Sequence, residues 1–199
     1  MLTENEVGQL LEVPEVREIV GQLHHLFVIE ENELNDISMH DFFAGVLLAP
    51  SVALAQVDGS TSLFEELSLN KKARRFSRGG FFLRHDPVVR MTILLQSRFQ
   101  YWELRFFQAL NRILKAVVPE TSASNHETAE DHDQFRVVMN TSYILIRLLE
   151  TFFLPEGEEI TRTRRVSRIE FGRIQQIGEQ LQLSGIGSFK KFINTFEVK

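Results

Sequence analysis

Two segments of the chain concentrate the cationic side chains that could bind an anion. Residues 71–84 hold several Lys and Arg with Phe between them, and residues 162–173 hold a run of Arg. Lys and Arg neutralise phosphates and aromatic rings stack on bases, so the two segments predict a polyanion-binding surface if folding places them on one face. The anion-binding candidates are Lys71, Lys72, Arg74, Arg75, Arg78, Arg164, Arg165 and Arg168. The alternative, which we favour, is a solvated helix end followed by a loop whose rings fill the core.

A glycine turn near the C-terminus adds a further anion-binding candidate. Gly185 and Gly187 are separated by one Ile, and this turn resembles the hairpin of helix-hairpin-helix DNA-binding motifs. The resemblance implies that its backbone N–H groups face a phosphate. It covers only residues 177–192, and Lys191 stands where the family has a small residue. The more ordinary interpretation, which we favour, is a turn in which Gly185 ends one helix and a neighbouring serine caps the next.

Other patterns that could support catalysis or metal binding are incomplete. The chain has no Cys, which excludes thiol nucleophiles, Cys-based zinc sites and disulfides. His126, Glu127 and Glu130 match part of a His-Glu-x-x-His zinc motif, but the second His is missing and the surrounding composition favours a solvated acidic loop. The Gly-rich phosphate-binding motifs and the Gly-x-Ser-x-Gly elbow are also absent. We therefore predict no catalytic residue, no metal site and no cofactor, and expect a binding protein rather than an enzyme.

The elements that must position these residues are predicted to be helices, and the clearest lies over residues 87–118. Apolar residues from Met91 to Val117 recur there at steps of three and four, which is the periodicity of one helix face. Asp86 and Pro87 suit its first turn, because Asp can cap the helix and Pro fits the first helical position. We take this as the central helix of the fold.

Weaker helix signals occupy most of the remaining sequence. Capping patterns stand at Thr3, Ser38 and Ser62, and Pro50 should kink or break the apolar helix that follows Ser38. No period-two pattern is sustained, so a sheet is not expected. Further helices are expected over about 15–34, 134–153 and 164–183, with a last short helix after Gly187.

The fold class predicted from these signals is all-α. We expect a bundle of roughly seven helices around the long central helix at about 87–118, in a single domain over residues 1–199. Residues 119–133 are polar and acidic without apolar spacing, so they predict a flexible linker.

Charge is segregated into four blocks along the chain. The net charges are −12 over residues 1–66, +9 over 67–118, −7 over 119–159 and +5 over 160–199, which together give the net charge of −5. One interpretation is that acidic helices pack beside basic ones and neutralise them. The other is that a charged face steers a partner of opposite charge. We favour neutralisation within the fold.

The function expected first is a non-enzymatic helical protein-interaction module that binds another protein or self-associates as a homo-oligomer. The chain has 17 Phe, and four apolar residues lie off the main stripe of the central helix, so one face could pack internally and another against a partner. These four are Ile93, Leu104, Phe107 and Leu114. The alternatives are a nucleic-acid or polyanion binder through residues 71–84 and 162–173, and a Phe-lined helical pocket for an apolar small ligand. The N-terminal segment lacks a basic region and the longest apolar stretch carries charges, so we expect a cytoplasmic protein that does not engage a membrane.

Overall fold

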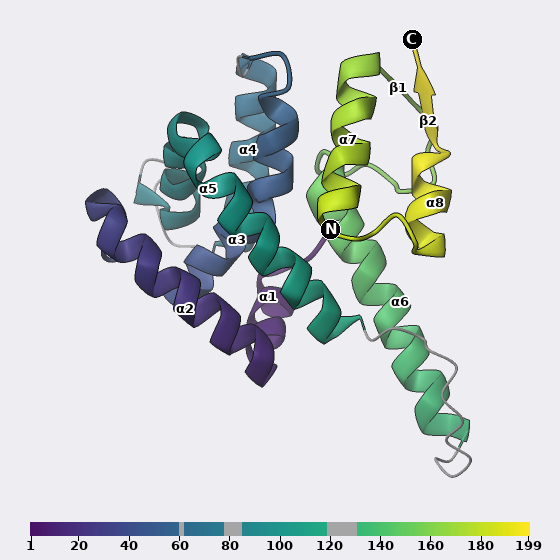
Figure 1. The fold of residues 1–199 in the computed structure, drawn as a ribbon, viewed down its shortest axis with the longest axis horizontal. Coiled ribbons are helices and arrows are strands. Elements are labelled where there is room, and N and C mark those ends of the chain that lie inside the picture. The colour runs from purple at the N-terminus through teal and green to yellow at the C-terminus, as the bar shows by residue number, and fades with distance from the viewer. Residues whose placement is uncertain (60–61, 78–84, 119–130) are drawn as a thin grey trace.

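The structure of the chain, a computed structural model, describes residues 1–59, 62–77, 85–118 and 131–199, with residues 131–140 described by their backbone only. Within these ranges it is an all-α protein of eight α-helices, one short 3-10 helix and two three-residue strands (Figure 1). None of the described helices is both long and apolar enough to cross a membrane. The helices are α1 (Glu4–Leu11), α2 (Pro14–Glu30), α3 (Met39–Ala55), α4 (Leu63–Phe76), α5 (Pro87–Val117), α6 (Asp131–Phe153), α7 (Arg168–Gln180) and α8 (Gly187–Ile193).

Helix α3 is the most deeply buried element of the fold. Of its 17 residues, 15 are buried, and it packs against α1, α2, α4, α5, α6 and α7. The sequence predicts that Pro50 should kink or break this helix, but α3 continues through Pro50 to Ala55. A proline removes one backbone hydrogen bond, and contact with helices on all sides outweighs that loss.

Helix α5 confirms the long helix predicted over residues 87–118. Its N-cap is Asp86, whose side chain accepts hydrogen bonds from the backbone N–H groups of Val88 and Val89. The helix bends at Arg98, where the backbone leaves helical geometry. The periodic stripe is buried from Met91 to Ile113, as predicted, and Val117 at its end is half-buried. Of the four apolar residues that lie off this stripe, Phe107 and Leu114 are buried, whereas Ile93 and Leu104 are exposed.

Predicted helix starts agree with the structure where a cap specifies them. Thr3, Ser38 and Ser62 are N-caps whose side chains accept from the backbone N–H three residues later. Helix α2 ends at Glu30, four residues before the predicted Leu34, and a 3-10 turn over Asn32–Leu34 completes that segment. Helix α6 begins at Asp131, inside the predicted linker; the rest of that linker, and Arg78, lie outside the described residues.

The predicted helix over residues 164–183 is wrong at both ends. Its first part forms strand β1 (Arg164–Val166), which pairs in parallel with β2 (Phe196–Val198). Three residues are too few to show an alternating pattern, and Ser167, whose capping box with Glu170 starts α7, marks the true beginning.

Gly185 does not end helix α7, contrary to the prediction. The helix ends near Leu181, and Gln182 takes the left-handed conformation with φ 56°. The N–H of Leu183 donates to the carbonyl of Gly178, and that of Gln182 to Glu179, which is the Schellman arrangement. The buried Leu183 supplies the apolar contact of that motif. It thereby fixes the chain that leads to α8.

Candidate functional site

A pocket of about 430 Å³ lies between α4 and the C-terminal segment that contains β1 and α7. Figure 1 shows α4 and α7 side by side, with β1 and β2 beyond α7. The volume falls in the range of small-molecule sites. Four of the lining residues are Phe, from α4, the end of α6 and β2: Phe64, Phe152, Phe153 and Phe196. Leu54, Leu69 and Ile174 extend the apolar lining, and Phe64, 78% exposed, stands at the mouth.

The polar groups of this pocket come from α3, α4, α7 and the segment between α6 and α7. Ser51 lies on α3 and Lys72 on α4, while Glu158 and Arg164 come from the segment after α6. Lys72 is only 4% exposed and Ser51 7%. The pocket therefore combines an apolar wall with a small convergent polar set, which is the composition typical of a ligand site.

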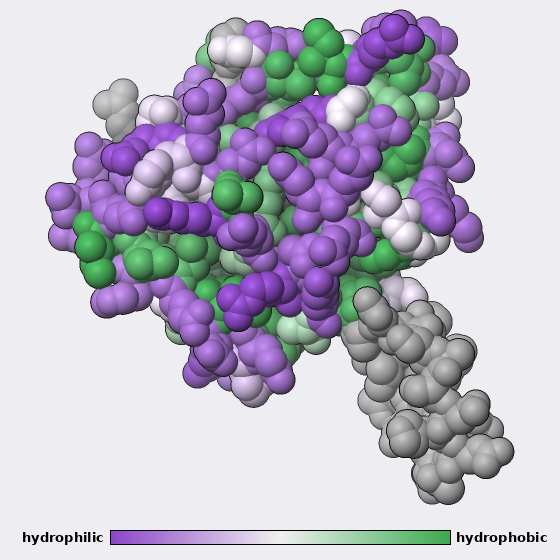
Figure 2. All heavy atoms as spheres, in the orientation of Figure 1, coloured by the Kyte–Doolittle hydropathy of each residue, from purple (hydrophilic) through white to green (hydrophobic). Residues whose placement is uncertain are grey.

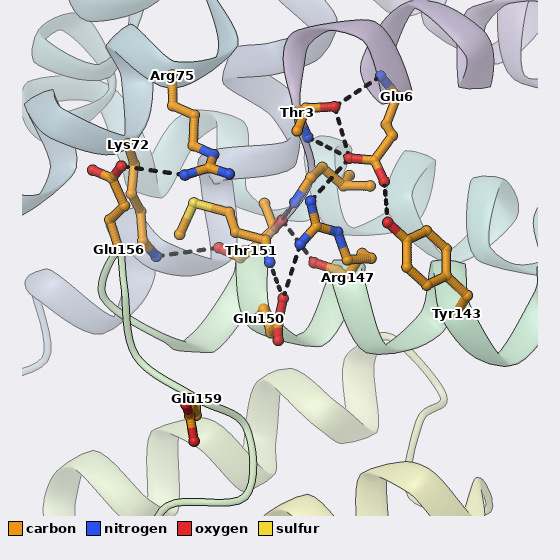
Figure 3. A network of polar contacts seen from close by, with 12 residues as sticks. Thr3, Glu6, Lys72, Arg75, Tyr143, Arg147, Glu150, Thr151, Glu156 and Glu159 are labelled. Atoms are coloured by element: carbon orange, nitrogen blue, oxygen red, sulfur yellow. Dashed lines mark hydrogen bonds and ion pairs between the residues drawn. The ribbon is translucent and has the colours of Figure 1, made fainter.

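The Lys72 side chain reaches from α4 to the C-terminal end of α6 (Figure 3). Its Nζ donates to the Oγ of Ser51 at 2.7 Å and to the backbone carbonyl of Thr151 at 3.2 Å. The Ser51 hydroxyl lies 3.0 Å from the carbonyls of both Thr151 and Phe152 and can donate to either. These carbonyls belong to the last turn of α6, where no helical N–H remains to satisfy them. Lys72 and Ser51 thus cap α6, and the negative end of its dipole favours a cation there.

Burial makes Lys72 an unusual amine. Removal from water lowers its pKa from 10.5 to about 7, and the distant Glu158 carboxylate only partly opposes this shift. Among the described residues, no carboxylate lies within ion-pair distance of the Nζ. The amine therefore changes charge near neutral pH, in contrast to an ordinary surface lysine.

Protonation of Lys72 changes how many of its N–H groups need an acceptor. A neutral amine has two N–H groups, and the Ser51 hydroxyl and the Thr151 carbonyl accept both. Protonation adds a third N–H, and within the described part of the chain no third acceptor contacts the Nζ. Because Lys72 lines the pocket, a ligand there can supply that acceptor.

Arg164, in contrast, already has protein acceptors for four of its five guanidinium N–H groups. Its guanidinium donates to the carboxylate of Glu158, to the carbonyls of Glu159 and Arg162, and to the hydroxyl of Thr195. The ion pair with Glu158 is 2.8 Å long and largely buried. Arg164 therefore holds the wall of the pocket and has little capacity left for a ligand.

The sequence-predicted anion-binding candidates separate into two groups. Lys72, Arg164 and Arg165 line the same pocket, so the two basic segments do converge there. Arg75 and Lys71 pair instead with Glu156, and Arg165 also pairs with Glu197. The remaining described candidates lie outside the pocket lining and are exposed: Arg74, Arg168, Gly185 and Gly187.

Ser51 and the end of α6 were missed by sequence reasoning. Ser51 is a lone hydroxyl in an otherwise apolar helix, directly after Pro50, and a polar residue at such a position needs a buried partner. That signal could have singled out Ser51. Nothing in the sequence identifies Thr151 and Phe152 as the acceptors, because they act through backbone carbonyls.

A second polar network fixes α6 against α1 (Figure 3). The Glu6 carboxylate accepts from Arg147 at 3.1 Å, from the Tyr143 hydroxyl at 2.9 Å and from Thr3. Burial alone would raise the Glu6 pKa, but the hydrogen bonds from Arg147, Thr3 and Tyr143 outweigh it and lower the pKa to about 2. Arg147 also contacts Glu150. This network holds the helix whose C-terminal end forms the floor around Lys72.

A second concave region, here called the α2–α5 seam, shares no lining residue with the Lys72 pocket. It is a groove of about 610 Å³ whose floor is formed by buried Ile19, Leu23 and Phe107. Leu26, 47% exposed, and Leu104, 65% exposed, flank it. Figure 2 shows hydrophobic residues breaking the mainly hydrophilic surface over α2 and α5. The other lining residues are one alanine, five amides and two arginines: Ala109, Gln22, Gln108, Asn111, Gln180, Gln182, Arg105 and Arg112.

The charges beside the seam explain part of the block pattern of the sequence. Arg105 pairs with Glu30, Arg98 with Glu31 and Arg90 with Asp36, so the basic α5 packs beside the acidic end of α2. At the other end of the seam the charges are open. Glu15 and Glu18 on α2 and Arg112 and Lys115 on α5 are exposed, and none has an ion-pair partner in the described part of the chain.

Comparisons with known proteins add no relative to this geometry. No family model, no curated protein and no solved structure matches the chain. Among the described residues, no group of three or more His, Asp or Glu is placed to hold a metal ion. The functional argument therefore depends on the pocket and the seam themselves.

Proposed function

We propose that this protein binds a small apolar molecule in the Phe-lined pocket above Lys72. The observation that carries the proposal is a pocket of about 430 Å³ that is lined by four Phe together with a buried amine and its serine partner. Apolar surface on both the ligand and the pocket supplies the affinity, at roughly 25 cal/mol per Å² of area removed from water. The few polar groups on the floor fix the orientation of the ligand.

Methyl NMR with an uncharged probe tests this proposal. Titration with 1-octanol should shift the methyl signals of Leu54, Leu69 and Ile174, which line the pocket, and leave those of Leu26 and Leu104 unchanged. Equal shifts at both sets would indicate nonspecific binding, and no shift at the pocket methyls would contradict the proposal.

A pair of neighbouring substitutions provides a matched control. Ser68 is half-buried and lines the pocket, whereas Leu67 is exposed and does not. Ser68→Trp should fill the cavity and abolish octanol binding, while Leu67→Trp, one residue away on α4, should retain it. Loss of binding in both variants, or in neither, would contradict the assignment to this pocket.

A second candidate function, self-association through the α2–α5 seam, is favoured by the arrangement of its charges. The two helices are antiparallel along the seam, because the C-terminal Glu30 of α2 meets Arg105, whereas Ile19 and Asn111 line the other end. A twofold axis running along the seam would place α2 of each copy on α5 of the other. Glu15 and Glu18 would then face Arg112 and Lys115 of the second copy, and the exposed apolar residues would meet at the other end.

Sedimentation velocity over a range of protein concentrations tests this second function. We expect a concentration-dependent dimer that Leu104→Asp abolishes. Leu67→Asp introduces the same charge at an exposed leucine of α4 and should leave the dimer intact. A wild-type monomer at every concentration, or equal sensitivity to both substitutions, would contradict the seam as an interface.

A further inference from the structure

We propose that the natural ligand of the pocket is an apolar monocarboxylate, and that Lys72 takes up a proton when the carboxylate binds. This inference rests on the proposed function, because it names the head group of the ligand held in the same cavity. It arises from the number of hydrogen bonds that Lys72 makes and from the state of the charges around it.

The geometry around the Nζ selects an acceptor. Ser51 and Thr151 occupy two N–H positions on Lys72, at 2.7 and 3.2 Å, and no described protein atom accepts a third. The third N–H exists only in the protonated amine. A ligand oxygen that carries negative charge fills this position and at the same time stabilises the ammonium form, which burial disfavours.

The charged residues that line the pocket favour a ligand with one negative charge over a ligand with two. Glu65 on α4, Glu158 after α6 and Glu170 on α7 all line the pocket and would repel a dianion. The guanidinium of Arg164 is occupied by Glu158 and three further acceptors, and Arg165 is paired with Glu197. Lys72 is the buried cation of the pocket, and its one free N–H matches a carboxylate better than a phosphate, which needs several donors.

Binding of the carboxylate should favour protonation of Lys72. The pKa of Lys72 is near 7 in the free protein, so at higher pH the amine is neutral and a proton must be taken up before the carboxylate is stabilised. The titratable and charged groups on the elements packed around it are Glu65, Arg75, Glu156, Glu158, Arg164, Arg165 and Glu170, together with the Met1 amino group, Arg147 and Glu150 near the end of α6. No histidine lines the pocket, so no imidazole titrates there in the same range.

Calorimetric titration of the full chain with octanoate and with 1-octanol, from pH 6 to pH 9, tests the inference. Octanoate should bind more tightly than octanol at pH 6, and its Kd should rise by about tenfold per pH unit above 7, whereas octanol affinity should stay constant. In buffers of different ionisation enthalpy, octanoate binding at pH 8 should show uptake of about one proton. Octyl phosphate should bind more weakly than octanoate.

Two lysine variants assign the effect to one residue. Lys72→Met should keep octanol binding and lose both the preference for octanoate and its pH dependence. Lys71→Met, at the exposed neighbouring lysine, should behave as wild type. Should Lys72→Met fail to fold, Ser51→Ala provides a second test, because it frees another N–H of Lys72 for the ligand and should strengthen octanoate binding relative to octanol binding.

The outcomes separate the inference from the proposed function. Suppose that octanol binds, but octanoate binds no more tightly than octanol or its affinity does not vary with pH. That result would overturn the carboxylate inference and leave the apolar pocket standing. Failure of both probes to bind would overturn the proposed function itself. A pH dependence that survives in Lys72→Met would assign the titration to another group and overturn the role of Lys72.

Discussion

The Lys72 pocket differs from the Glu30 end of the α2–α5 seam in whether its cation has a carboxylate partner. At the seam, Arg98 and Arg105 each meet a carboxylate of the α2 end, Glu31 and Glu30, so the cations are neutralised where the helices touch. In the pocket, Lys72 is almost fully buried with only a hydroxyl and a carbonyl as partners. Paired charges select which helices pack together, whereas a buried amine without a counter-ion is costly to the fold. Strongly perturbed groups of that kind concentrate at functional sites.

The largest expected effect is at Glu31, a buried carboxylate beside the seam. Glu31 accepts a 2.7 Å hydrogen bond from the indole of Trp102, which is fully buried, and pairs with Arg98 at 3.2 Å. Glu31→Ala leaves the indole N–H without an acceptor, and we expect a loss of about 3 kcal/mol in the free energy of unfolding. Denaturation by urea measures it. Glu33→Ala, at an exposed neighbour, should change little; equal losses would contradict the importance of the buried pair.

Removal of the Lys72 charge from the pocket should have the opposite effect and raise the free energy of unfolding. Lys72→Met replaces the buried amine by an apolar chain of similar length and should stabilise the protein by about 2 kcal/mol at pH 7. The folded pKa is lowered to about 7 from 10.5, so the cost of Lys72 is absent above 10.5 and grows as pH falls towards 7. The advantage of the variant should therefore shrink as pH is raised from 7 to 10. If Lys72→Met were instead less stable than the wild type, by an amount that does not vary with pH, Lys72 could not be a costly buried amine without a counter-ion.

A substitution at the contact between α1 and α6 should have a smaller effect on the free energy of unfolding. Glu6→Gln weakens the hydrogen bonds from Arg147 and Tyr143 and should cost about 1 kcal/mol at neutral pH, since water screens this partly exposed group. Because the folded pKa is lowered to about 2 from 4.5, this stability is present above 4.5 and is lost as pH falls from 4.5 to 2. Thermal melts across that range measure it, with Glu15→Gln on α2 as the exposed control.

The smallest effect is expected at the exposed pair of the seam. Arg105 lies 2.9 Å from Glu30 and also contacts the Tyr101 ring, but all three side chains remain in contact with water. Exposed pairs contribute little because water and salt screen them. Arg105→Gln should therefore leave the melting temperature within experimental error. A loss comparable to that of Glu31→Ala would show that burial does not distinguish the two pairs.

Elements with strong local signals could be predicted from the sequence. The caps at Thr3, Ser62 and Asp86 and the long stripe of α5 specify helices through backbone hydrogen bonds and burial, and each is present. Strand β1 could not be predicted, because its partner lies about 30 residues away and neither strand is long enough to show a pattern. The continuation of α3 through Pro50 likewise depends on its tertiary neighbours.

The site could be predicted only in part. Both basic segments were identified, and Lys72, Arg164 and Arg165 do line one pocket. The sequence could not show that Lys72 is buried while Lys71 is exposed, because that difference depends on which face of α4 meets α3 and α6. Nor could it show that backbone carbonyls at the end of α6 provide an acceptor for the amine.

The most direct test of this account is an NMR titration of the Lys72 side chain, using ¹³Cε and ¹⁵Nζ signals assigned by comparison with Lys72→Met. We expect a midpoint near pH 7 in the free protein and an upward shift of that midpoint when octanoate is bound. A midpoint above pH 10 that octanoate does not move would contradict it, because Lys72 would then be an ordinary solvated cation and not the buried amine of a ligand site.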